Sequence, residues 1–166
     1  MDAVSINRVM VIGCPGSGKS TFAAGLSRRT GLPLIHLDNI WWRADRTHVS
    51  PEEFDRALSE VLRGDRWIID GDYGRTYEAR LRACDMVVFL DIDEEECLSG
   101  IAERIGKPRA DLPWTEEEPD PELTELVKSY RALRRPALIK LLEKYPDRRV
   151  FIFGTRAQAE EWLAAL

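Results

Sequence analysis

Short apolar runs alternate with longer segments of mixed polarity along the chain. Each run is rich in Val, Ile, Leu or Phe and is bounded by polar residues, glycine or proline. Continuous runs of this kind are typical of strands that are buried on both faces of a parallel sheet. The five predicted strands cover residues 8–12, 33–37, 66–70, 86–91 and 149–153.

The segments between these runs carry helical patterns. Apolar residues recur at three- and four-residue steps over residues 121–145, where Pro136 should kink or split the helix. Ser50 before Pro51, and Asp93 before three glutamates, are suitable N-caps. The predicted helices cover residues 20–29, 51–62, 93–105, 121–145 and 156–166.

Strands that alternate with helices predict a three-layer α/β/α fold around a parallel sheet. The 166 residues are one domain's length, so we expect a single domain over residues 1–166. Residues 106–120 show no period and are rich in Pro, Glu and Asp. A loop of this length is typically a functional lid or a disordered segment.

A glycine-rich segment after the first predicted strand carries the main functional prediction. Residues 13–20 read Gly-Cys-Pro-Gly-Ser-Gly-Lys-Ser and match the phosphate-loop pattern G-x-x-x-x-G-K-[ST]. Glycines let backbone N–H groups approach a polyphosphate, and the following helix N-terminus adds partial positive charge. Lys19 can reach the β and γ phosphates of ATP, and the Ser20 hydroxyl can ligate Mg²⁺. The predicted ATP contacts in the loop are Gly13, Pro15, Gly16, Ser17, Gly18, Lys19, Ser20 and Thr21.

Two other interpretations of this segment fit less well. A plain glycine turn before a helix has no need of Lys-Ser after its last glycine. The dinucleotide pattern G-x-G-x-x-G fails because Thr21 stands where the third glycine belongs.

A magnesium ion beside the phosphates needs a carboxylate at the end of a neighbouring strand. Two predicted strands end in such a residue, Asp70 and Asp91. The residues alone do not show which of the two would bind the metal. The alternative for either one is that the aspartate only starts a turn. Asp70 is favoured, with Ser20 as the second ligand, because Gly71 behind it leaves room for a ligand.

The composition narrows the class of protein. A formal net charge of −5 lacks the basic excess of a nucleic-acid-binding surface, so we do not expect nucleic acid as a partner. No apolar run approaches the roughly 18–20 residues of a membrane helix, and the first residues do not read as a signal peptide. The three cysteines fit neither a disulfide framework nor a zinc site. We therefore expect a reduced, cytoplasmic protein with no membrane partner.

Four segments carry a wider resemblance. They are residues 8–21, residues 36–42 with His36-Leu37-Asp38 and Trp41-Trp42, residues 67–73, and residues 85–91. Together they resemble the small P-loop kinases of the adenylate kinase and shikimate kinase group. Within that group the chain is most similar to the bacterial topology modulation (FlaR-like) proteins. The resemblance covers essentially the whole chain, but none of the segments marks a substrate.

The resemblance implies a five-stranded parallel sheet in the order 2-3-1-4-5 and a short lid at about residues 104–120. Asp38 lies where related kinases bind the phosphate acceptor, and its carboxylate could accept a proton from the acceptor hydroxyl. The alternative is that Asp38 caps the following turn. Trp41 could stack on an acceptor ring or lie in the core. Gly71 matches the Asp-Gly step after the third strand of adenylate-kinase-like enzymes and is placed with the acceptor.

Arginines near the lid are the expected phosphate clamps, because planar guanidinium groups match the oxygens of a transferring phosphoryl group. The resemblance places Arg104 and Arg109 in this role. Gly100 departs from the group, which often has an arginine at this position. One phosphate contact would then be missing or supplied from the long helix by Arg131, Arg134 or Arg135.

Three further arginines are candidate contacts. Arg75 and Arg135 are placed with the acceptor, and Arg156 follows the last strand, where the group packs the nucleotide base. The alternative for each arginine of the chain is a solvated surface residue.

These observations predict an ATP- and Mg²⁺-dependent kinase that phosphorylates a small acceptor, such as a nucleoside, a nucleotide or another hydroxylated metabolite. The alternatives are a non-catalytic ATP- or GTP-binding regulator of the topology modulation type and a slow NTPase without an acceptor. We expect a monomer or a homodimer.

Overall fold

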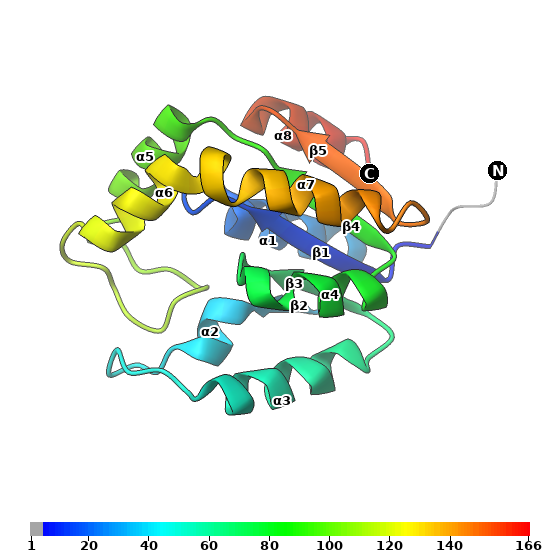
Figure 1. The fold of residues 1–166 in the computed structure, drawn as a ribbon, viewed down its shortest axis with the longest axis horizontal. Helices are drawn as coiled ribbons and strands as arrows, with labels where there is room; N and C mark the ends of the chain where they lie inside the picture. The colour runs from blue at the N-terminus through cyan, green and yellow to red at the C-terminus, as the bar shows by residue number, and fades with distance from the viewer. Residues whose placement is uncertain (1–4) are drawn as a thin grey trace.

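A computed structural model describes residues 5–166 (Figure 1). Five parallel strands form one sheet in the order β2-β3-β1-β4-β5, which confirms the predicted order. The strands are β1 (Arg8–Gly13), β2 (Leu34–His36), β3 (Trp67–Asp70), β4 (Met86–Leu90) and β5 (Arg149–Phe153).

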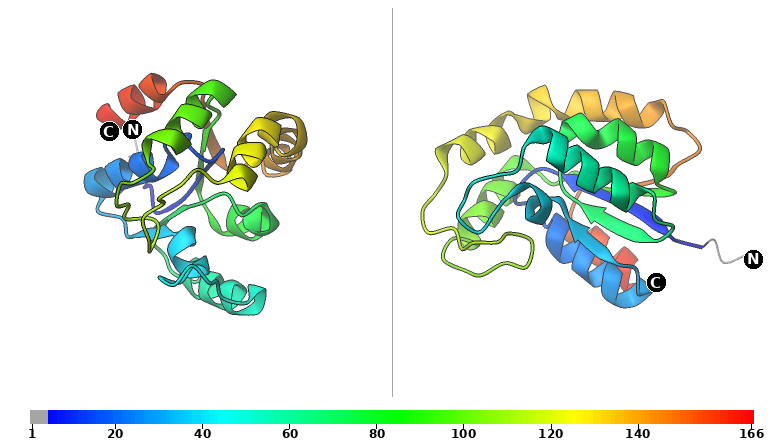
Figure 2. Two further views of the ribbon diagram at one scale, coloured as in Figure 1. Left: turned by 90° about the vertical axis from the view of Figure 1, so that its left-hand side faces the viewer. Right: turned by 90° about the horizontal axis from the view of Figure 1, so that it is seen from below.

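Helices cover both faces of the sheet (Figure 2). One face carries α1 and α8, which contact each other, and the other carries α4, α6 and α7. The helices are α1 (Lys19–Thr30), α2 (Leu37–Trp41), α3 (Pro51–Leu62), α4 (Tyr77–Ala83), α5 (Glu94–Glu103), α6 (Pro121–Leu133), α7 (Arg135–Glu143) and α8 (Arg156–Ala164), with a short 3₁₀ turn η1 (Gly74–Thr76).

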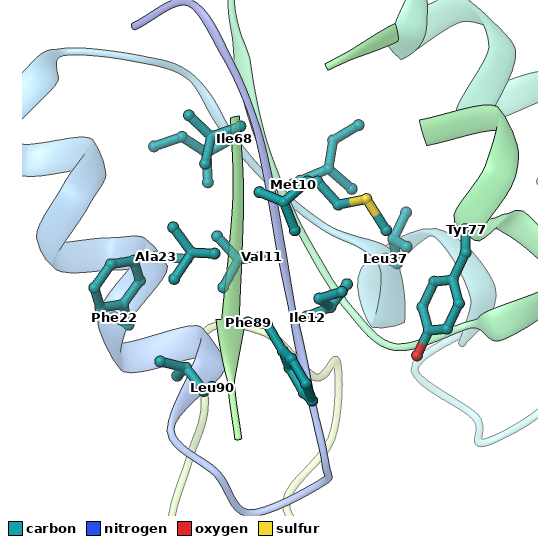
Figure 3. Packing of buried hydrophobic residues seen from close by; sticks show 14 of the residues in the cluster. Met10, Val11, Ile12, Phe22, Ala23, Leu37, Ile68, Tyr77, Phe89 and Leu90 are labelled. Carbon is teal, nitrogen blue, oxygen red and sulfur yellow. The ribbon is translucent and has the colours of Figure 1, made fainter. Parts of the chain in front are cut away.

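The central strand β1 is apolar on both faces because helices pack on both. Val11 points toward Phe22 of α1, whereas Met10 and Ile12 lie on the side of Tyr77 (Figure 3). Residues 9–12 are fully buried. This continuous burial anchors the phosphate loop, which begins where β1 ends.

The long helical pattern divides at Pro136, as predicted. α6 ends at Leu133 and α7 begins at Arg135, with the proline in its first turn. A proline is tolerated there because the first N–H groups of a helix have no partner within it. The expected caps also form, since Ser50 accepts from the Glu53 N–H group and Asp93 accepts from that of Glu96.

Two helices were not predicted. α2 has only five residues, which is too short for a helical period to show. α4 turns Tyr77, Arg80 and Leu81 into the core, and a charged residue at a buried position hides the apolar stripe. None of the helices within residues 5–166 is long and apolar enough to cross a membrane.

Candidate active site

A cleft opens at the carboxyl end of the sheet, between the phosphate loop, α2, the loop after β3 and residues 104–120, which we call the lid. The lid runs from the end of α5 toward α2 (Figure 1). Ligands of parallel α/β sheets bind at this edge. The predicted site residues that line the cleft are Pro15, Gly16, Ser17, Gly18, Lys19, Ser20, Thr21, Asp38, Asp70, Gly71, Arg75, Arg104, Arg109 and Arg156. Gly13, Trp41 and Arg135 are not among the lining residues.

The phosphate loop turns tightly between β1 and α1. Gly16 and Gly18 have φ angles of 82° and 97°, in the left-handed region that favours glycine. A Cβ at Gly16 would lie 2.1 Å from the carbonyl oxygen of Cys97, so no larger residue fits there. Because α1 begins at Lys19, its unpaired N-terminal amides lie at the cleft and favour an anion.

Two cations bond the carbonyl oxygens of this loop. Lys19 Nζ donates to the oxygen of Cys14 at 3.2 Å. Arg156 Nη2 donates to the oxygen of Gly16 at 2.7 Å, so Arg156 braces the loop from α8. Gly13 does not line the cleft. It lets β1 lie close to β4, because a Cβ at this position would lie 2.6 Å from the carbonyl oxygen of Leu90.

Two carboxylates converge on the Ser20 hydroxyl. Ser20 Oγ lies 3.0 Å from Asp70 Oδ2 and 2.7 Å from Asp111 Oδ2. Asp70 ends β3 and Asp111 comes from the lid, and both are buried. His36 Nδ1 lies 2.7 Å from Asp70 Oδ2. Burial opposes a charged imidazole, but the hydrogen bond and charge of Asp70 outweigh it and raise the pKa of His36.

Ser20 and Asp70 fit a magnesium ion, because Mg²⁺ prefers hydroxyl and carboxylate oxygens. Within residues 5–166, no group of three or more His, Cys, Asp or Glu side chains could hold a metal ion by itself. Phosphate oxygens and water would therefore have to complete the coordination. The other candidate carboxylate, Asp91, is bonded by Arg135 at 2.8 and 2.9 Å and lies 3.6 Å from Arg131.

The opposite wall of the cleft is organised around Asp38 of α2. Tyr73 Oη donates to Asp38 Oδ1 at 2.6 Å. Burial raises the pKa of Asp38, and the bond from Tyr73 and the charge of Lys19 only partly offset it. Asp38 lies within α2, where His36 is the N-cap residue, so the carboxylate faces Tyr73 and does not cap the turn.

A buried arginine that the sequence analysis missed holds the loop after β3. The Arg80 side chain is fully buried and donates to the carbonyl oxygens of Gly71 at 2.8 Å and Asp72 at 2.5 Å. Burial lowers the pKa of Arg80 to about 10, which leaves it charged at neutral pH. Arg80 thereby fixes the backbone that carries Tyr73. No motif marks it, because its partners are mostly backbone oxygens.

Carboxylates of the lid contact the two arginines expected to clamp phosphate. Arg109 donates to Asp111 at 2.9 and 2.5 Å and to Glu116 at 2.5 Å. Arg104 Nε lies 3.5 Å from Glu116. Burial opposes the charge of Arg109, but Asp111 and Glu116 raise its pKa overall. Two of the lid acids, Asp111 and Glu116, thus form a partly buried ion-pair network, whereas Glu117, Glu118 and Asp120 are exposed.

The two adjacent tryptophans have different surroundings. Trp41 stacks on His48 at 4.3 Å and packs edge-on against Phe54 at 5.6 Å, away from the cleft. Trp42 lines the cleft and meets Trp114 of the lid edge to face, with ring centroids 4.9 Å apart. Of the two adjacent tryptophans, Trp42 rather than Trp41 therefore lines the cleft. Trp114 could not be anticipated, because the lid sequence has no period.

Two other expected acceptor contacts pair with nearby carboxylates. Arg75 lines the cleft but binds Asp55 of α3 through two bonds of 2.9 Å. Arg135 binds Asp91. Guanidinium groups paired in this way are less available to an acceptor.

Packing explains why glycine stands at two positions of the site, and the sequence alone did not indicate this. A Cβ at Gly71 would lie 2.9 Å from the Cβ atom of Leu37, so this glycine makes room for a side chain of the core. A Cβ at Gly100 would lie 2.1 Å from the carbonyl oxygen of Gly16. Gly100 is therefore where α5 touches the phosphate loop, and an arginine could not occupy this position without moving the loop.

Comparisons with known proteins agree with this geometry. No protein-family model matches the chain. Adenylate kinase from Encephalitozoon cuniculi (strain GB-M1) is 25% identical in an alignment 117 residues long, and the match covers 59% of this chain and 66% of that enzyme. The chain thus spans just under two thirds of that relative.

Solved structures match over nearly the whole chain. Shikimate kinase from Acinetobacter baumannii, in complex with shikimate, has a TM-score of 0.64 at 15% identity and covers 97% of this chain and 93% of its own. Shikimate kinase from Bacteroides thetaiotaomicron has a TM-score of 0.59 at 19% identity, covering 97% and 96%. Deoxyadenosine kinase from M. mycoides, with products dCMP and dCDP bound, has a TM-score of 0.55 at 14% identity, and the match covers 95% of each of the two chains.

The chain has the fold of the P-loop nucleotide and small-molecule kinases. The adenylate kinase relative and the shikimate and deoxyadenosine kinase neighbours support an enzyme of the kinase class. They do not favour the regulator alternative, and the closer similarity to the topology modulation proteins stays a prediction.

Proposed function

We propose that this protein is a P-loop kinase that transfers the γ-phosphoryl group of ATP, bound with Mg²⁺, to a hydroxyl group of a small acceptor. One observation carries the proposal. The phosphate loop with Lys19 and the partly buried carboxylate of Asp38 line the same cleft. Phosphoryl transfer needs these two features together, a cradle for the triphosphate and a group that orients the attacking hydroxyl.

The nucleotide side uses backbone and charge. The amides of residues 16–21 and the ammonium group of Lys19 hold the phosphates. Arg104 and Arg109 line the cleft from the lid, and their guanidinium groups would contact the transferring phosphoryl group once Arg109 exchanges its bond with Glu116 for a phosphate oxygen. Mg²⁺ held at Ser20 and Asp70 supplies positive charge that the β and γ phosphates require. Arg156 keeps the loop in shape through the carbonyl oxygen of Gly16.

The acceptor side uses Asp38. Tyr73 occupies Oδ1 of Asp38, which leaves Oδ2 to accept a hydrogen bond from the acceptor hydroxyl. The acceptor oxygen forms a bond to the γ phosphorus, the bond from phosphorus to the β–γ bridging oxygen breaks, and ADP leaves. The hydroxyl proton passes to Asp38. A pKa raised by burial suits Asp38 to this proton transfer.

A transfer assay with γ-labelled ATP tests the proposal. The first acceptors are shikimate and deoxyadenosine, which the neighbours' names suggest, and nucleosides, nucleotides and sugars follow. We expect label on one acceptor class. We expect Lys19→Ala to lower turnover or ATP affinity at least about tenfold, because a charge-assisted phosphate contact contributes roughly 1.5–3 kcal/mol.

Lys140→Ala is the matched control, since Lys140 is an exposed lysine on α7. Its transfer rate should equal that of the unaltered protein. Phosphate release that no acceptor changes, with no label transferred, would contradict the proposal and favour a simple NTPase.

A further inference from the structure

The most unusual contact of the cleft joins the lid to the phosphate loop. Asp111 is only 6% exposed, although it lies in the seventeen-residue loop between α5 and α6. Its Oδ2 atom lies 2.7 Å from Ser20 Oγ, and Asp70 Oδ2 approaches the same hydroxyl at 3.0 Å. One hydroxyl proton can serve only one of these two oxygens at a time.

The two oxygen distances at the Ser20 hydroxyl are compatible with a magnesium site. Ligands of Mg²⁺ lie about 2.1 Å from the ion in an octahedron, so neighbouring ligand oxygens are about 3.0 Å apart. The Ser20–Asp70 and Ser20–Asp111 oxygen distances are 3.0 and 2.7 Å. The Ser20 hydroxyl thus has two carboxylate oxygens at about this distance. One belongs to Asp70 at the end of β3, and the other belongs to Asp111 of the lid.

Further contacts hold Asp111 in this position. Asn39 Nδ2 of α2 donates to the carbonyl oxygen of Ala110 at 2.8 Å, and Arg109 binds both carboxylate oxygens of Asp111. These contacts therefore hold the carboxylate beside the Ser20 hydroxyl.

We propose that Asp111 is a second carboxylate ligand of the magnesium site and that the lid carries it there. The inference rests on the proposed function and deepens it. Lid closure and metal binding become one event, because the lid supplies part of the coordination.

Metal affinity measured apart from turnover tests the inference. Mn²⁺ is the probe, and its free concentration is followed by electron paramagnetic resonance in the presence of a non-hydrolysable ATP analogue. We expect Asp111→Asn to weaken Mn²⁺ binding about tenfold or more, the range for altered metal-site partners. Binding of the analogue in EDTA should be unchanged or tighter, because a negative charge near the phosphates is removed.

Glu118→Gln is the matched control, since it removes one exposed lid carboxylate, and its Mn²⁺ affinity should equal that of the unaltered protein. Asp111→Glu, which keeps the charge, covers the case in which Asp111→Asn does not fold, and it should bind Mn²⁺ better than Asp111→Ser.

Unchanged Mn²⁺ affinity in Asp111→Asn overturns the inference. The inference is also overturned if Asp111→Asn binds the analogue more tightly than the unaltered protein does, by the same factor with Mn²⁺ and in EDTA. That result would mean that the contact of Asp111 with Ser20 competes with ATP. If the unaltered protein binds no analogue with Mn²⁺, the proposed function fails first and the inference fails with it.

Discussion

At the scale of single residues, the environment of Asp38 sets its chemistry. The carboxylate is partly buried beside Tyr73, and burial raises its pKa above the ordinary value. Below the ordinary pKa of about 3.9, the group is protonated in the folded and unfolded states alike. As the pH rises through the higher pKa of the folded state, ionisation in the cleft costs free energy, so this residue makes the protein less stable at neutral pH.

Asp38→Asn should therefore be more stable than the unaltered protein at pH 7, and the difference should shrink toward pH 4. Urea unfolding at several pH values measures it. Phosphoryl transfer in this variant should fall by about 100-fold or more, the range for loss of a general base. Asp65→Asn, at an exposed aspartate, is the control. A stability difference that is independent of pH would show that burial of the Asp38 charge is not the cause.

At the scale of elements, the contact of α5 with the phosphate loop is the tightest constraint on the site. Gly100 of α5 lies against the backbone of Gly16, and Gly16 lies against the backbone of Cys97. Two glycines let a helix and a loop meet without side chains between them. The shape of the phosphate loop therefore depends on α5 as well as on its own sequence.

Gly100→Ala tests this contact. Alanine in a helix normally stabilises by roughly 1 kcal/mol relative to glycine. Here the new Cβ would lie 2.1 Å from a backbone oxygen that cannot move aside cheaply. We expect the free energy of unfolding to fall by about 1–3 kcal/mol, as for other overpacked sites, together with weaker ATP binding.

Ser99→Ala, at an exposed position of the same helix, should change the free energy of unfolding by less than about 0.5 kcal/mol. A Gly100→Ala variant as stable as the unaltered protein, with normal ATP affinity, would show that α5 can shift away from the loop.

At the scale of the whole molecule, the cleft joins segments from distant parts of the chain. The phosphate loop, α2, the loop after β3 and the lid meet there because β1 lies between β3 and β4. A ligand that binds all of them stabilises the folded state only. At 100 times its dissociation constant it adds about 2.7 kcal/mol to the free energy of unfolding.

Magnesium and a non-hydrolysable ATP analogue should accordingly raise the melting temperature. For a chain of this size roughly 2–4 °C per kcal/mol is expected, which gives about 5–11 °C. Differential scanning calorimetry measures the shift. Removal of magnesium with EDTA should reduce it. Lys19→Ala should reduce it by about half or more, because tenfold weaker binding removes about 1.4 kcal/mol. An equal shift in Lys19→Ala would mean that the analogue binds elsewhere.

Local patterns were enough to predict the strands, most of the helices and the phosphate loop. Burial of a strand on both faces leaves a continuous apolar run, as in residues 9–12, and a phosphate loop needs Gly and Lys at fixed spacings. The division of the long helix followed from Pro136 alone. The strand order came from family resemblance, which reflects the whole chain.

Tertiary structure alone decided the environment of the site. Asp111 and Ser20 are 91 residues apart in the chain, and no period or motif relates them. Arg80 binds backbone carbonyl oxygens that any sequence could provide. Whether Asp91 faces a cleft or an ion pair depended on where α6 and α7 place their arginines. Short-range patterns record backbone geometry, whereas the partner of a charged side chain is set by which distant segments the fold brings within hydrogen-bond distance.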